Sequence, residues 1–135
     1  MKVQYVKIEH VNLMWPTIEP FIKKVSEIAG SEYTTDQYKL RLIDGTWQAL
    51  VFVDDSHVIH GVVVVCFYNR PNARVGFIVA VGGNNIINHD NWDQLRDYMR
   101  MNGATVMEGN VRKSVARLWS RLGGKEKYSV VGETL

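Results

Sequence analysis

A chain of 135 residues can form one folded domain with its own hydrophobic core, so we expect a single domain over residues 1–135. Hydrophobic residues make up 46% and charged residues 22% of the chain, which argues against a disordered or fibrous protein. The 16 basic and 14 acidic residues leave a net charge of +2, so the composition does not favour nucleic-acid binding.

Two features of the sequence bear on the compartment in which the protein works. The single cysteine, Cys66, lies in the apolar run HGVVVVCF and is expected to be a small core residue rather than a reactive thiol. Residues 1–14 lack the pattern of a signal peptide, and no apolar stretch approaches the roughly 18 residues that span a bilayer. We therefore expect a reducing compartment, the cytoplasm or the interior of a virion, and no membrane partner.

The N-terminal third of the chain predicts one strand followed by two helices. The opening KVQYVKIEHV, residues 2–11, alternates in the manner of a strand. A helix is expected to begin near Pro16 and to end at Gly30, because apolar residues recur every three or four positions between them. A shorter helix follows, with Thr34 or Thr35 as its N-cap.

The middle of the chain predicts three antiparallel strands. Residues 46–54, 57–69 and 73–83 are rich in β-branched and aromatic residues, and the segments DDS and NRPN between them consist of turn-forming residues. The run GVVVVCF lies in the second of these strands and is apolar on both faces. We therefore expect that strand to be central in the sheet and to be covered by helices on either side.

The last third of the chain alternates helices with short strands. The segment 89–103 has the apolar spacing of a helix, with Asp90 as its expected N-cap, and the segment 104–111 is expected to form a strand. The segment 111–124 predicts the most regular amphipathic helix, with an apolar stripe on one side and, on the other, four basic residues that Lys125 extends to five. The segment 125–135 is expected to form a last strand.

The predicted order is β-α-α-β-β-β-α-β-α-β, which indicates a mixed α/β fold with antiparallel strands first and helical crossovers last. In this order the chain resembles the GCN5-related N-acetyltransferase (GNAT) superfamily. The resemblance is carried by DGTWQALVFVDDSHVIHGVV, by FIVAVGG leading into a helix, and by VARLWSRLGGKEKYS, and it extends over nearly the whole chain. It implies a GNAT-like fold, an α+β arrangement around a mixed sheet.

The resemblance also implies a binding site for acetyl-CoA after the strand FIVAVGG. In the superfamily, an Arg/Gln-x-x-Gly-x-Gly/Ala loop binds the pyrophosphate through backbone amides at the start of a helix, where glycines allow close approach and the helix dipole favours an anion. The cofactor-binding residues implied in this chain are Val79, Val81, Gly82, Gly83, Asn84, Asn85 and Asn110. Of these, Asn110 lies about two residues from the position of the family's asparagine.

The loop departs from the family pattern. No Arg or Gln precedes the glycines at the family distance, and the second Gly/Ala is absent. Asp90 and Asp93 would repel a pyrophosphate placed at the start of the helix. The alternative is that Gly82 and Gly83 only turn the strand and that Asp90 caps the helix.

Catalysis in the superfamily needs a base that takes a proton from an ammonium group and, often, a tyrosine that protonates the leaving thiolate. Glu108 is the best candidate for the catalytic base, although it fits the solvated end of a strand as well. Trp119 stands at the tyrosine position and cannot act as an acid, and Gly124 replaces the usual phenylalanine. An active enzyme would therefore depend on positioning two substrates and on water.

No metal site is predicted. His57 and His60 are expected on one strand with their side chains on opposite faces, so they cannot share a metal ion. The basic side of the segment 111–124 is normally a solvated face, but it also fits an anionic cofactor tail, nucleic acid or an acidic partner.

Two functions are consistent with the sequence. The first is an N-acetyltransferase that uses acetyl-CoA on an amine of a small molecule or a protein. The second is a catalytically silent assembly protein, similar to the compact, degenerate GNAT-like proteins of tailed bacteriophages, with a phage protein or another copy of the chain as its partner. In that case the protein is expected in the host cytoplasm or the virion. The discriminating feature is whether the strands 73–83 and 104–111 separate enough to admit the pantetheine arm.

Overall fold

The computed structural model describes residues 1–29 and 32–135, without the side chains of residues 28 and 29, so the helix end predicted at Gly30 lies outside the described residues. The elements in chain order are β1 (Lys2–Val6), η1 (Ile8–His10), α1 (Val11–Ala29), α2 (Thr35–Ile43), β2 (Gln48–Val53), β3 (Ile59–Arg70), β4 (Ala73–Gly83), α3 (His89–Met101), β5 (Val106–Gly109) and α4 (Lys113–Arg121). None of the described helices is long and apolar enough to span a membrane.

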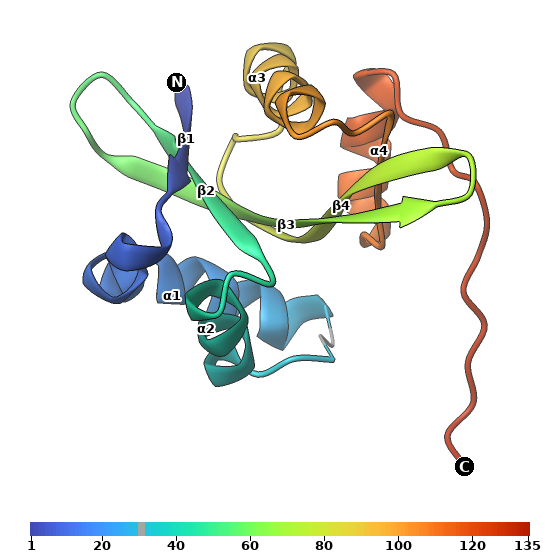
Figure 1. Ribbon diagram of the computed structural model, residues 1–135, viewed down its shortest axis with the longest axis horizontal. Helices are drawn as coiled ribbons and strands as arrows, with labels where there is room; N and C mark the ends of the chain where they lie inside the picture. Colours follow the sequence, from blue (N-terminus) through green and yellow to red (C-terminus); the bar gives the residue numbers. More distant parts are fainter. Residues whose placement is uncertain (30–31) are drawn as a thin grey trace.

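Five strands form one mixed sheet in the order β1-β2-β3-β4-β5. The first four strands pair antiparallel with their neighbours, and β5 pairs parallel with β4 after the crossover through α3 (Figure 1). This topology confirms the predicted order of elements from the first strand to α4. The predicted mixed α/β fold is therefore confirmed.

The sheet separates two hydrophobic cores. α1 and α2 cover one face of the sheet, and α3 and α4 cover the other (Figure 1). The side chains of β3 alternate between them: Val62 and Val64 pack toward α1, whereas Val63 and Val65 pack toward α3. All four valines are at most 2% exposed. The prediction of a central strand covered on both faces is thus confirmed.

The start of α1 differs from the prediction. The helix begins at Val11 and contains both Pro16 and Pro20, so the start predicted near Pro16 was wrong. Val11 and Trp15 are buried in the core beneath the sheet. Burial of these two side chains stabilises a helical turn that the local sequence alone does not favour.

The N-caps of α2 and α3 show how short polar side chains set the helix starts. Thr34 caps α2 as predicted: its hydroxyl accepts a hydrogen bond from Gln37 N at 3.2 Å, and Gln37 Oε1 accepts one from Thr34 N at 2.9 Å. α3 is capped by Asn88, whose Oδ1 accepts a hydrogen bond from Asn91 N at 2.9 Å. The prediction of Asp90 as the cap was therefore wrong, because Asp90 already lies in the first helical turn.

The strand predicted for residues 125–135 does not form. This segment, which we call the tail, is drawn out and leaves the body of the protein (Figure 1). Its composition suits a strand, but a strand also needs a neighbour with free main-chain groups. Within the described chain, no strand pairs with the tail.

Candidate functional site

A β-bulge at Val79 interrupts β4 where the predicted cofactor-binding residues begin. Val64 pairs with Ala80 and Val65 pairs with Ile78, so Val79 has no partner in β3. Val79 and Ala80 are consecutive, yet both pack against the core on the α1 side. The alternation of side chains along β4 is therefore shifted from this point onward.

β5 accompanies β4 along only part of its length. The parallel pairs run from Val75 and Val106 to Ile78 and Gly109. Beyond Ile78, residues Val79–Gly83 have no partner in β5, so one main-chain edge of β4 lacks a strand neighbour in the described part of the chain. We call Val79–Gly83 the free edge of β4.

The two glycines of the predicted loop belong to β4 and still pair with β3. A Cβ atom on Gly82 would lie 2.8 Å from the carbonyl oxygen of Phe21 in α1, and one on Gly83 would lie 2.6 Å from the Cα of Gly61 in β3. Gly83 also has a φ of 140°, which disfavours other residues. The fold therefore requires both glycines for close packing within β4, whose bounds match the predicted strand 73–83. The turn begins at Asn84, so the alternative that the glycines turn the strand was wrong.

The turn between β4 and α3 presents two asparagines to solvent. Asn84 and Asn85 are exposed, and Asn85 adopts the left-handed conformation with a φ of 55°. Ile86 anchors the turn, since it is 3% exposed and its carbonyl accepts a hydrogen bond from Asn91 Nδ2 at 2.9 Å. Asn84 and Asn85 are thus the part of the predicted loop that a ligand can reach.

The start of α3 carries negative charge. The side chain of Asp90 is 74% exposed, and its carboxylate lies 3.8 Å from the amino group of Met1. Gln94 Nε2 donates a hydrogen bond to the same carboxylate at 3.2 Å. An anion bound at this helix end would meet a repulsive charge from Asp90 that the amino group of Met1 only partly offsets.

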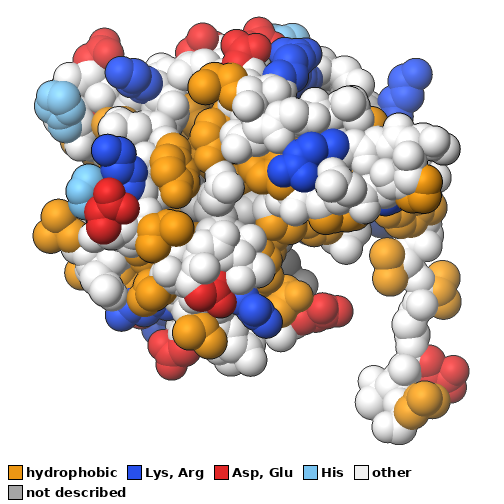
Figure 2. All heavy atoms as spheres, in the orientation of Figure 1, with side chains coloured by type: hydrophobic (Ala, Val, Ile, Leu, Met, Phe, Trp, Pro, Cys, Tyr) orange, Lys and Arg blue, Asp and Glu red, His pale blue; other side chains and the backbone are white. Residues whose placement is uncertain are grey.

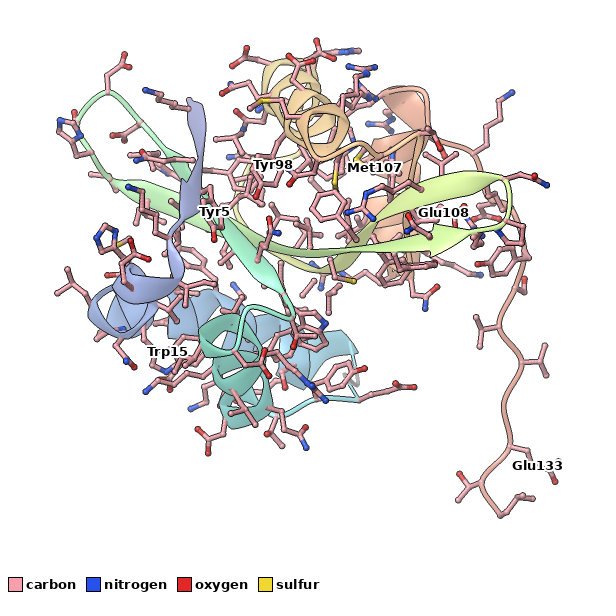
Figure 3. All side chains as sticks on the ribbon, in the orientation of Figure 1. Tyr5, Trp15, Tyr98, Met107, Glu108 and Glu133 are labelled. Atoms are coloured by element: carbon pink, nitrogen blue, oxygen red, sulfur yellow. The ribbon has the colours of Figure 1, made fainter. Side chains whose placement is uncertain are left out.

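Glu108 lies in β5, beside Phe77 of β4, and its side chain is 7% exposed (Figure 3). Its Oε2 accepts hydrogen bonds from Arg70 and, at 2.8 Å, from Lys127 Nζ. These two bonds, the one from Arg70 above all, hold the pKa of Glu108 below its usual value. A lower pKa makes the carboxylate a weaker base, which does not favour the predicted catalytic role.

Arg70 and Lys127 are the residues of this site that the sequence reasoning missed. Arg70 ends β3 and pairs with Ala73, so a hairpin register drawn from the sequence would have placed it beside the start of β4. Lys127 lies in the tail, and its contact with Glu108 has no signal in the sequence.

Trp119 and Gly124 are complementary in size. A Cβ atom on Gly124 would lie 2.5 Å from Cδ1 of Trp119, so the indole fills the space beside the glycine. The Trp119 ring also makes an edge-to-face contact with Trp92 of α3, with 5.8 Å between centroids. Trp119, at the family's tyrosine position, thus occupies the space that is left by Gly124 at the family's phenylalanine position.

The predicted site residues fall into two groups. The first group forms the end of β4 and the turn after it: Val79, Val81, Gly82, Gly83, Asn84 and Asn85. The second group, Glu108 and Asn110, lies at β5 and lines a cleft of about 1080 Å³ together with Trp119 and residues 125–130 of the tail. Within the described chain, no residue of the first group lines this cleft.

The histidines are arranged differently from the prediction. β3 begins at Ile59, so His57 lies in the preceding turn, where its φ is 64°, and not on the strand. His60 Nε2 lies 2.7 Å from Asp54 Oδ2. Among the described residues, no three His, Cys, Asp or Glu side chains come together as metal ligands.

Comparison with known proteins places this architecture. No protein-family model matches the chain, and no curated protein does. Solved structures match along its whole length. A ribosomal-protein-alanine N-acetyltransferase from Brucella melitensis biovar Abortus 2308 is 14% identical, with a TM-score of 0.72 and 100% of each chain covered. The chain has the GNAT fold.

Two further structures support this assignment of the GNAT fold. An aminoglycoside acetyltransferase from an uncultured soil metagenomic sample, in complex with sisomicin, is 10% identical, with a TM-score of 0.72 over 99% of this chain and 94% of that one. A probable acetyltransferase is 14% identical, with a TM-score of 0.70 over 100% of this chain and 97% of that one. At these identities the likeness shows the fold and not the activity.

Proposed function

We propose that this protein is an acyltransferase that transfers the acetyl group of acetyl-CoA to an amine. The observation that carries the proposal is the free edge of β4, Val79–Gly83, which β5 leaves unpaired directly after the bulge. An extended ligand with amide groups, such as the pantetheine arm of acetyl-CoA, suits hydrogen bonding to an unpaired strand edge. The GNAT fold and the acetyltransferases among the similar structures support the same function.

The position of each part of the site suggests its role in the reaction. The exposed Asn85 lies before α3 and would offer its main-chain amide to a pyrophosphate, whereas Asn84 N already donates a hydrogen bond to the carbonyl oxygen of His60 at 3.4 Å. In the transfer, the amine nitrogen bonds to the acetyl carbon, the carbon–sulfur bond breaks, and the thiolate leaves. The proton of the amine passes to water, because Glu108 is engaged by Arg70 and Lys127.

Calorimetric titration of the full chain with acetyl-CoA tests the proposal. We expect a micromolar dissociation constant for the wild type, and binding weaker by about tenfold for Asn84→Glu, which adds a negative charge to the exposed turn. Asn72→Glu makes the same change in the exposed turn between β3 and β4 and should bind like the wild type. Substitution of Gly83 is unsuitable, because any side chain there would collide with β3.

A second variant keeps the titration decisive. Asp90→Asn removes the exposed carboxylate at the start of α3 and should tighten the binding of acetyl-CoA a few-fold. The proposal is wrong if a folded wild type shows no heat with acetyl-CoA and Asp90→Asn shows none either.

A catalytically silent assembly protein, of the kind that tailed bacteriophages encode, is the second candidate. The cleft at β5 favours it, because Glu108 is neutralised by two cations and Trp119 fills the space beside Gly124. Such a protein would bind a further copy of itself or another assembly protein and no acetyl-CoA. This candidate predicts that neither the wild type nor Asp90→Asn gives any heat when titrated with acetyl-CoA.

A further inference from the structure

The outer edge of β5 is open to another chain. β5 is the last strand of the sheet and pairs with β4 on one side only. Its residues Val106–Gly109 line the cleft of about 1080 Å³. An unpaired strand edge offers N–H and C=O groups to any extended segment that reaches it.

The tail of the same chain pairs with no strand of the described chain. Lys127 Nζ, 2.8 Å from Glu108 Oε2, holds the tail beside β5. Farther along, Tyr128, Val130 and Val131 are 67%, 76% and 92% exposed, and Figure 2 shows apolar side chains along the projecting tail. Apolar side chains gathered on a projecting segment indicate a surface that binds another protein.

We propose that residues 130–135 of the tail insert into the cleft of a second copy of this chain and pair there with β5. The tail of the second copy enters the first cleft in return, so the two contacts are identical and the assembly is a symmetric dimer. Each inserted segment adds one strand to the sheet of its partner, and Val130 and Val131 leave water.

The direction of the tail selects a second copy as the occupant. Residues 125–130 line their own cleft together with Val106–Gly109 of β5. Residues beyond them continue away from the body, and the end of the chain lies far from β5 (Figure 1). The far part of the tail is therefore placed to reach another molecule and not its own sheet.

The charges of the two surfaces are complementary. Arg112, Lys113 and Lys125 line the cleft together with Glu32 and Glu126, and none of the five forms an ion pair within the described part of the chain, so the cations exceed the anions by one. The one charged side chain in residues 130–135 is that of Glu133. Insertion of the tail brings this carboxylate toward unpaired cations, which favours the exchange.

Light scattering coupled to size-exclusion chromatography tests the proposal on the full chain without acetyl-CoA. We expect the wild type to run at about twice the chain mass of 15.4 kDa and Val131→Asp to run at 15.4 kDa. Val58→Asp is the matched control, since Val58 is also exposed, at 51%, and lies in the turn before β3; it should remain dimeric. A monomeric wild type, or a Val131→Asp variant that stays dimeric, overturns the proposal.

Hydrogen exchange connects the dimer to β5. The amides of Val106–Gly109 should exchange more slowly in the wild type than in Val131→Asp. The N–H groups on the outer side of β5 gain hydrogen-bond acceptors only when the tail of a second copy pairs with them. A dimer whose β5 amides exchange at the same rate in both proteins would place the interface elsewhere and overturn the proposal.

Discussion

The free edge of β4 and the outer edge of β5 are both strand edges without a partner, yet their surroundings are opposite. At the end of β4, Gly82 packs against α1 and Gly83 against β3, and the nearest helix start carries the charge of Asp90. At β5, the strand and the tail both line an open cleft, in which Arg112, Lys113 and Lys125 outnumber Glu32 and Glu126 among the described side chains without an ion pair. The two glycines at the end of β4 are packed closely against α1 and β3, whereas the cleft at β5 is open.

The difference shows where this sheet leaves room for a ligand or a partner. The protein's own packing fills the space beside the glycines of β4, and the open cleft lies at β5. Glycines after a strand are usually interpreted as a sign of ligand binding, but here both glycines are needed by the protein's own packing. A ligand at the end of β4 must therefore use the main-chain edge and the exposed turn. Substitutions in each region change the free energy of unfolding according to how closely that region is packed.

The largest effect is expected at Gly83. Gly83→Ala should lower the free energy of unfolding by about 3 kcal/mol, because it combines an unfavourable φ with a collision against Gly61. Gly103→Ala is the control: Gly103 also has a positive φ, of 82°, but its added Cβ meets only an ordinary contact at 3.4 Å. That variant should lose about 1 kcal/mol. Urea denaturation of both measures the difference, and equal losses would mean that the end of β4 is not closely packed.

The next effect concerns Trp119 and Gly124. Gly124→Phe should cost about 2 kcal/mol, because the new side chain collides with the indole. Trp119→Tyr alone should cost about 1 kcal/mol through its contact with Trp92. If the two residues are complementary, the double variant loses about 1 kcal/mol less than the sum of the single losses. Strictly additive losses would show that the two positions vary independently.

The sequence was informative where the structure depends on local pattern. The apolar run in β3, the cap at Thr34 and the order of elements each follow from residues near one another in the chain. Each could be predicted because propensity and burial favour the same conformation there.

The failures have a common cause, which is contact between distant residues. The early start of α1 depends on burial of Val11 and Trp15 in the core beneath the sheet. The environment of Glu108 depends on Arg70 and Lys127, which are 38 and 19 positions away. The tail has the composition of a strand but no neighbour in its own chain to pair with, and composition cannot supply one.

Glu108 offers a smaller effect with a defined pH dependence. Glu108→Gln should lower the free energy of unfolding by about 1–2 kcal/mol at neutral pH, since the variant loses the negative charge that forms ion pairs with Arg70 and Lys127. The pKa of Glu108 is lowered from 4.5 in the folded protein, so its stabilisation is present above that pH. It disappears as the pH falls through the lowered pKa. Denaturation at several pH values should show the variant and the wild type converging in acid, and a constant difference would argue against these ion pairs.

The smallest effect is expected at Tyr98 of α3, which packs in the core between α3 and the sheet and does not line the cleft. Burial, followed by the neighbouring Tyr5, raises the pKa of Tyr98 to about 12, and its hydroxyl donates a hydrogen bond to Gln48 Oε1 (Figure 3). The unfolded chain loses this proton near pH 10, so the stabilisation is complete below pH 10 and is lost as the pH rises to about 12. Because the ring is only partly buried and water screens it, we expect this loss to amount to at most about 1 kcal/mol.

Tyr98→Phe isolates that contribution. The wild type should lose stability between pH 10 and about 12 more steeply than the variant, whereas Glu108→Gln should follow the wild type over the same range. Parallel alkaline curves for the wild type and Tyr98→Phe would mean that the tyrosine titrates as it does in the unfolded chain. Since Tyr98 neither belongs to the free edge of β4 nor lines the cleft, its variant also gives the baseline against which losses at those two edges are judged.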